Sequence, residues 1–183
     1  MEDMMYFYEY NCPFVNYDCC GYRGDINMHV RRAIAHITGG PLAPDIKGTV
    51  TFTQVHGGTE VSVKVNGLPS YRPAMNGNPQ IGPHGFHLHQ NGTCAVGDPS
   101  NPFISAGEHW NPTSQPHGNH AGDFPVLFSN NGYSRMTFFT DKFNVAQIIG
   151  KSVIIHESPD DYRTQPSGAS GNRLACGVIK AVM

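Results

Sequence analysis

Length, net charge and charged-residue content set the first bounds on this protein. The chain has 183 residues, a formal net charge of −2 and 14% charged residues, which fits one domain with an appended segment. Nucleic-acid binding requires a basic surface, so we expect no nucleic-acid partner. No apolar run approaches the ~20 residues that cross a bilayer, and the start of the chain lacks the basic and apolar regions of a secretory signal. We therefore expect no membrane association, and the location stays open between the cytoplasm and a cell surface such as a spore coat.

Residues 1–31 differ in composition from the rest of the chain and form a predicted N-terminal arm. Its aromatic and thiol side chains are Tyr6, Phe7, Tyr8, Tyr10, Cys12, Phe14, Tyr17, Cys19, Cys20 and Tyr22. The C-x₆-C-C spacing of the cysteines is not a recognised zinc pattern. Two interpretations remain open: a poorly ordered arm, or a segment for assembly into a spore coat or envelope, by cross-linking or by packing on a neighbour.

From residue 32 onward, apolar and polar residues alternate with the period of strands that bury one face. The clearest runs are Thr49–Thr53 and Val61–Val65, and His56-Gly57-Gly58 between them is typical of a hairpin turn. Six more strands are predicted, at Ala33–Thr38, His84–Gln90, Asp123–Phe128, Tyr133–Thr140, Lys151–Glu157 and Leu174–Val182. No segment has helical periodicity, so residues 32–183 are predicted to be one all-β domain, an eight-stranded antiparallel sandwich or flattened barrel.

Residues that could bind a metal are concentrated in the second half of the chain. His87 and His89 lie two apart on a predicted strand, so both imidazoles project from one face and can bind one ion. The long loop that follows adds four ligand-capable residues: His109, His117, His120 and Asp123. Imidazoles and a carboxylate suit four-coordinate zinc. Because long loops in compact domains are usually either functional or disordered, this content favours a functional loop.

Five separate motifs, in order and at compatible spacing, resemble the copper–zinc superoxide dismutase family of the bacterial type. They are GFHLH at 85–89, SAGEHWNP at 105–112, HAGD at 120–123, IGKSVIIHE at 149–157 and GNRLACGVI at 171–179. The resemblance extends from about residue 32 to the C-terminus. It implies a Greek-key β fold and an antioxidant oxidoreductase that converts superoxide to dioxygen and hydrogen peroxide, with copper and zinc as cofactors.

The resemblance also implies roles for individual residues. The expected copper ligands are His87, His89, His109 and His156. The expected ligands of a structural zinc are His109, His117, His120 and Asp123, so that His109 bridges the two metals. The remaining expectations are Arg173 and His109 as catalytic residues, Asp160 as a link between a copper histidine and a zinc histidine, His84 as a structural histidine, and a disulfide between Cys94 and Cys176.

Other functions are compatible with parts of the sequence. A non-catalytic structural protein would keep the fold and the zinc, and the N-terminal arm favours incorporation into a larger assembly. A copper carrier would favour thiol or thioether ligands. A zinc hydrolase would need an open zinc position. The four histidines at the copper positions favour the enzyme, with superoxide as its substrate. Whether the chain forms a homodimer is left open.

Overall fold

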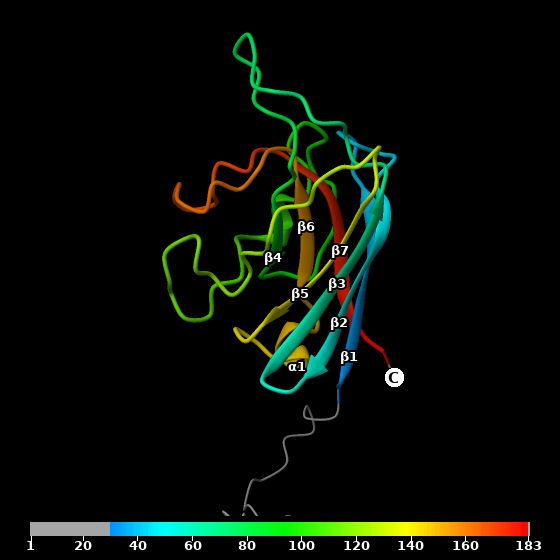
Figure 1. Cartoon of the computed structure of the whole chain (residues 1–183), viewed down its shortest axis with the longest axis vertical. Coiled ribbons are helices and arrows are strands. Elements are labelled where there is room, and N and C mark those ends of the chain that lie inside the picture. The colour runs from blue at the N-terminus through cyan, green and yellow to red at the C-terminus, as the bar shows by residue number, and fades with distance from the viewer. Residues whose placement is uncertain (1–29, 183) are drawn as a thin grey trace, which may run out of the picture.

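The computed structural model describes residues 30–182, and nearly all of the predicted N-terminal arm lies outside this range. Seven strands form one antiparallel sheet: β1 (Arg32–Gly39), β2 (Lys47–Val55), β3 (Gly58–Asn66), β4 (Phe86–His89), β5 (Ser134–Thr140), β6 (Ser152–His156) and β7 (Arg173–Ala181). Their order across the sheet is β4-β6-β7-β1-β2-β3-β5, and the sheet is strongly curled (Figure 1). A short helix, α1 (Val145–Ile148), precedes β6. The predicted all-β antiparallel fold is confirmed.

Seven of the eight predicted strands coincide with strands of the sheet, with ends that differ by at most three residues. The prediction of a regular strand at Asp123–Phe128 is wrong. This segment makes only isolated bridges, Asp123 to His87 and Leu127 to His84. The segment follows the loop that carries His117 and His120. It pairs with β4 and with the preceding His84 at two isolated positions and forms no continuous ladder.

The β2–β3 hairpin shows how alternation in the sequence becomes a two-faced sheet. Its register runs from Lys47 opposite Asn66 to Val55 opposite Gly58. The turn between the strands contains Gly57 at φ +79°, a left-handed conformation that glycine adopts without steric cost. The hairpin predicted at this place is confirmed.

The hydrophobic core lies on the inner side of the curled sheet. It includes fully buried side chains from most of the strands, among them Ala33, Ala35, Val50, Phe52, Val61, Val63, Val65, Phe86, Leu88, Val153, Ile155 and Ala175. In β4, Phe86 and Leu88 join this core while His87 and His89 alternate with them and are also fully buried. β4 is therefore covered on both faces, and its histidines lie beneath the long loops.

Two long connections, residues 90–133 and 157–172, pack around β4 and β6 on one side of the sheet (Figure 1). A disulfide between Cys94 and Cys176 joins the first connection to β7, as predicted, with a sequence separation of 82. A small hydrophobic cluster of Phe103, Ala106 and Ile154 packs at this disulfide. Within the described residues, no helix has the length and apolar character needed to span a membrane.

Candidate metal centre

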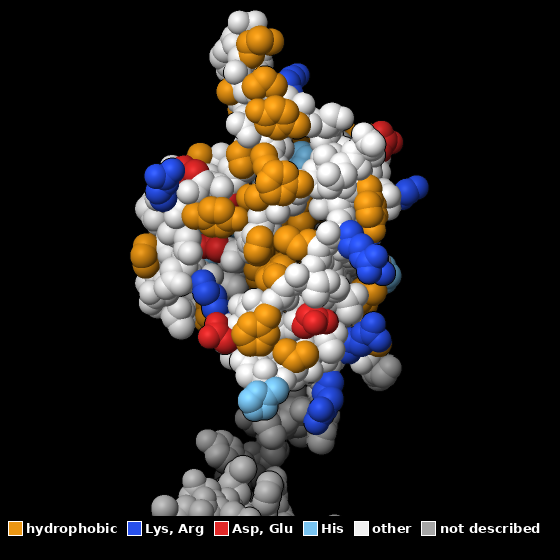
Figure 2. All heavy atoms as spheres, viewed as in Figure 1, with side chains coloured by type: hydrophobic (Ala, Val, Ile, Leu, Met, Phe, Trp, Pro, Cys, Tyr) orange, Lys and Arg blue, Asp and Glu red, His pale blue; other side chains and the backbone are white. Residues whose placement is uncertain are grey.

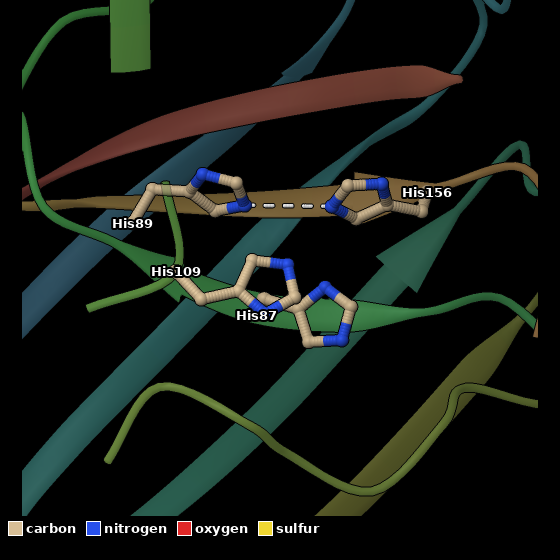
Figure 3. A group of neighbouring side chains, drawn as sticks. All are labelled: His87, His89, His109 and His156. Atoms are coloured by element: carbon tan, nitrogen blue, oxygen red, sulfur yellow. Dashed lines mark hydrogen bonds between the residues drawn. The ribbon is translucent and has the colours of Figure 1, made fainter. Parts of the chain in front are cut away.

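β4, β6 and one loop bring four histidines together (Figure 3). His87 and His89 lie on one face of β4, and His156 ends β6, which pairs with β4. His109 comes from the loop and forms an isolated bridge with His89. The ring centroids of His87 and His109 are 3.8 Å apart, and the Nε2 atoms of His89 and His156 face each other at 3.4 Å. Each residue offers a ring nitrogen within 4.8 Å of those of the others.

A second group of four ligand-capable residues shares His109 with the first. Its members are His109, His117, His120 and Asp123, again with ligand atoms within 4.8 Å of one another. The carboxylate of Asp123 is held in place by the backbone N–H groups of Gly118, at 2.8 Å, and His120, at 3.0 Å. The short spacing between His117 and His120 does not keep these side chains apart, because the intervening Gly118 takes a φ of +91°.

The side chain of Asp160 connects the two groups through hydrogen bonds. One of its carboxylate oxygens lies 2.7 Å from Nε2 of His87, and the other lies 2.8 Å from Nε2 of His117. Both imidazoles donate an N–H to this carboxylate, so each keeps a lone pair on Nδ1. Such hydrogen bonds fix the tautomer and the ring orientation of a metal-binding histidine. The Asp160 carboxylate, expected to link the two groups, therefore contacts one histidine of each.

The unpaired nitrogens of the histidines test whether these residues suit metal ions. Every buried side-chain nitrogen or oxygen without a hydrogen-bond partner in residues 30–182 belongs to this centre: His87 Nδ1, His109 Nε2, His117 Nδ1 and His120 Nδ1. Leaving a buried polar atom unpaired costs about 1–3 kcal/mol. His89 and His156 follow the same arrangement, since their Nδ1 atoms donate to the carbonyls of Gly107 and Gly171 and their Nε2 atoms point inward. This donor set fits imidazole-bound metal ions.

Burial and neighbouring groups shift the pKa values of several residues of the two groups toward the forms that bind metals. Burial, followed by the electrostatic influence of the neighbouring His109 imidazole, lowers the pKa of His156 to about 3. Burial, followed by neighbouring histidines, also holds the pKa values of His87 and His89 well below the usual value. Burial opposes ionisation of Asp123, but its hydrogen bond and electrostatic interaction with His109 outweigh this effect and hold the pKa of Asp123 far below the usual range. Neutral imidazoles beside a carboxylate are the forms that bind metals.

Arg173 lies at the start of β7, next to the first group. Its guanidinium donates to the carbonyl oxygens of Phe103, at 2.7 Å, and Gly107, at 2.8 Å. The carbonyl of Gly107 also accepts from Nδ1 of His89. The same backbone oxygen therefore orients both Arg173 and one histidine of the first group.

His84 belongs to neither group. It is fully buried, and its ring nitrogens face the carbonyl oxygens of His156, at 2.9 Å, and Pro69, at 3.2 Å. This position agrees with the structural role expected for it.

Sequence reasoning missed two residues that support the second group. The side-chain amide of Gln165 accepts from the backbone N–H of His117 at 2.8 Å and donates to its carbonyl at 3.4 Å. Gly168 leaves room for Asp160 to reach His117: a Cβ at this position would lie 1.8 Å from a carboxylate oxygen of Asp160. No spacing or composition in the 157–172 segment indicated either residue.

Comparison with known proteins identifies the family of the chain. The family model described as copper/zinc superoxide dismutase (SODC) matches residues 46–179. The chain belongs to this family. A copper–zinc superoxide dismutase of Deinococcus radiodurans is 34% identical over 154 residues, which cover 75% of this chain and 79% of that protein. A copper–zinc superoxide dismutase of Legionella pneumophila is 34% identical over 151 residues, covering 78% of this chain and 83% of that protein.

A solved structure agrees with the sequence comparisons. The copper/zinc superoxide dismutase from Brucella abortus superposes with a TM-score of 0.64 and 29% identity, over 80% of this chain and 98% of that one. The predicted family, oxidoreductase class and copper and zinc cofactors are therefore confirmed for this chain.

Proposed function

We propose that this protein dismutates superoxide to dioxygen and hydrogen peroxide at the two groups of ligands that share His109. Copper would be held by His87, His89, His109 and His156. Zinc would be held by His109, His117, His120 and Asp123. The observation that carries this proposal is the set of buried, unpaired ring nitrogens, because every one found in residues 30–182 belongs to these residues.

The metals and the chain have separate tasks in this proposal. Copper supplies one-electron redox chemistry through imidazole ligands that suit both of its oxidation states, while zinc supplies fixed charge and order. His109 offers a ring nitrogen to each group, and its Nε2, buried and without a protein partner, is where the chain can hold and transfer a proton. Peroxide formation requires such a proton beside the substrate.

Arg173 is the proposed anion-binding residue. Two of its N–H groups are occupied by the carbonyls of Phe103 and Gly107, and a guanidinium has five N–H donors in a fixed plane. The remaining donors are available to a small anion, and the charge is permanent at any physiological pH. Because the whole chain carries a net charge of −2, attraction of superoxide must come from local positive charge such as this one.

A matched pair of histidine variants tests the proposal. His156→Asn removes one ligand of the first group, and His36→Asn changes an exposed histidine on β1. Copper per chain and superoxide consumption are measured for both after loading with copper and zinc. We expect His156→Asn to lose at least about 100-fold in copper affinity or activity, and His36→Asn to match the parent protein. Equal copper binding and equal rates in both variants would contradict the proposed copper site.

The larger assemblies considered from the sequence remain predictions. A homodimer would require contacts with a second copy of the chain, and a spore-coat or envelope role for the N-terminal arm would require contacts with other molecules. Sedimentation velocity of the full chain at several protein concentrations would decide the oligomeric state.

A further inference from the structure

The outer face of the sheet, away from the metal centre, is strongly basic. Outward-facing positions on β1, β2, β3, β5 and β7 carry five exposed basic side chains, Arg32, Lys47, Lys64, Arg135 and Lys180, and one exposed acidic side chain, Glu60. Lys and Arg side chains are visible along this side of the molecule in Figure 2. We call this surface the basic face.

Strand register places three of these charges in one cluster. Lys64 on β3 lies directly opposite Arg135 on β5. On the other side of β3, Lys64 lies opposite Thr49, so Lys47, two residues earlier on β2, is its diagonal neighbour. Like charges in direct cross-strand pairs are destabilising, and diagonal neighbours are about 7–8 Å apart. The fold therefore maintains an unfavourable arrangement that a bound anionic group would relieve.

No carboxylate of residues 30–182 forms an ion pair within 4.0 Å with a basic side chain of this face. All ion pairs within 4.0 Å among these residues join a histidine and an aspartate of the metal centre. Apart from Glu60, the repulsion among the five exposed basic side chains is therefore reduced by water and dissolved ions. Between the charges lie small hydroxyl residues such as Thr51, Ser62 and Thr137, which leave the face flat enough for an extended segment.

The sequence contains a complementary segment. Residues 1–29 carry five of the acidic residues of the chain, Glu2, Asp3, Glu9, Asp18 and Asp25, and one basic residue, Arg23, for a net charge of −4. The basic face has the opposite net charge, with five basic side chains against one acidic. Residues 1–29 also lead directly into β1, whose first residue, Arg32, belongs to the basic face.

We propose that residues 1–29 of the same chain dock on the basic face. Fully extended, 29 residues span up to about 96 Å, whereas an eight-residue strand such as β1 spans about 26 Å, so the segment is long enough to turn back and cross several strands. A tethered segment binds at high effective concentration, so individually weak ion pairs suffice. Its tyrosines would contact outward-facing apolar side chains, among them Ile34 and the exposed Phe139.

Carbodiimide cross-linking of the full-length, metal-loaded chain tests the proposal, because it joins lysine amines to carboxylates that are in contact. At low salt we expect amide cross-links from Lys47, Lys64 or Lys180 to acidic residues of the segment 1–29. At 1 M NaCl, where the screening length falls to about 3 Å, the yield should fall at least about fivefold. In a mixture of isotopically light and heavy protein, the linked peptides should carry a single label.

A charge-matched pair of double variants supplies the control. Lys64→Gln with Arg135→Gln removes two charges from the cluster and should reduce cross-linking through Lys47 several-fold. Arg72→Gln with Arg163→Gln removes the same charge outside the basic face and should leave the yield unchanged. Absent cross-links at low salt, or equal yields in both double variants, would overturn the proposal. Mixed-label peptides would overturn it in favour of a second copy of the chain.

Discussion

At the scale of single residues, the metal centre depends on which ring nitrogen each histidine uses for a protein hydrogen bond. His87 and His117 use Nε2 to bind Asp160, while His89 and His156 use Nδ1 to bind backbone carbonyls. The nitrogen left over points into the centre in every case. The same residue type therefore supplies Nδ1 at some positions and Nε2 at others, and the supporting acceptors determine which.

Asp123 is the residue on which the second group depends most directly. Asp123→Ala removes a carboxylate that contacts His109 at 2.9 Å and two loop amides. We expect zinc affinity to fall by at least about 10–100-fold, because both a ligand and the hydrogen bonds that shape the loop are lost. Zinc per chain, measured by metal analysis after dialysis, checks this; Asp98→Ala, which changes a fully exposed residue, is the control. Unchanged zinc stoichiometry in Asp123→Ala would exclude the assignment.

Replacing Arg173 should lower the rate of superoxide consumption without changing the metal content. Arg173→Ala removes a charge beside the first group but none of the ring nitrogens. We expect kcat/KM for superoxide to fall about tenfold or more and to depend less on ionic strength, because a local positive charge raises the encounter rate of an anion. Rates measured across a salt series, with metal content determined on the same samples, test this. Identical salt dependence in variant and parent would rule out the proposed role.

At the scale of elements, the two long connections need anchors because they carry most of the site on irregular backbone. The Cys94–Cys176 disulfide is one anchor, and it closes a loop of 82 residues. Replacing both cysteines by serine should lower the free energy of unfolding by roughly 4–5 kcal/mol in the chain-entropy treatment. Denaturant unfolding of the metal-free protein measures the effect, so that metal binding does not mask it. A loss below about 1 kcal/mol would show that the loop is held mainly by its other contacts.

A substitution at Gly168 tests how tightly the 157–172 connection packs against the second group. Gly168→Ala would place a methyl group 2.5 Å from Nε2 of His117 and closer still to Asp160. Gly150→Ala is the matched control, since Gly150 also has a positive φ, +77°, but a methyl group there would have no atom within 4 Å. Both variants should lose about 1 kcal/mol of stability from backbone strain.

The two glycine variants should differ in zinc retention. Only Gly168→Ala displaces the Asp160–His117 hydrogen bond, so zinc affinity should fall by about 10–100-fold in this variant alone. Competition with a zinc chelator measures it. Equal zinc retention in both variants would show that the 157–172 connection adapts to the extra methyl group without moving His117.

The elements differ in how well the sequence predicts them. Strands such as β2 and β3 alternate buried and exposed residues, so their period of two is readable from the sequence. Asp123–Phe128 is mostly apolar, but it meets β4 and the nearby His84 only at isolated bridges. Pairing between distant segments is not encoded in local alternation. Gln165 and Gly168 were missed for a related reason, because their contacts with His117 span about 50 positions of the chain.

At the scale of the whole molecule, the two sides of the sheet carry different kinds of residues. One side is covered by the long connections and holds the metal centre, whereas the outer face carries the basic side chains. The motifs around the histidines predicted the first side well, because closely spaced ligand residues leave a pattern in the sequence. The basic face had no such pattern, since its charges come from five strands and are brought together only by register.

The central claim is that two metals bind side by side on ligands that share His109 and that this arrangement consumes superoxide. Metal analysis together with superoxide consumption, on full-length protein loaded with copper and zinc, tests it most directly. The account predicts about one copper and about one zinc per chain, with rapid turnover that a copper chelator removes, because each group of ligands suits one ion. Zinc without copper, or both metals without turnover, would contradict it.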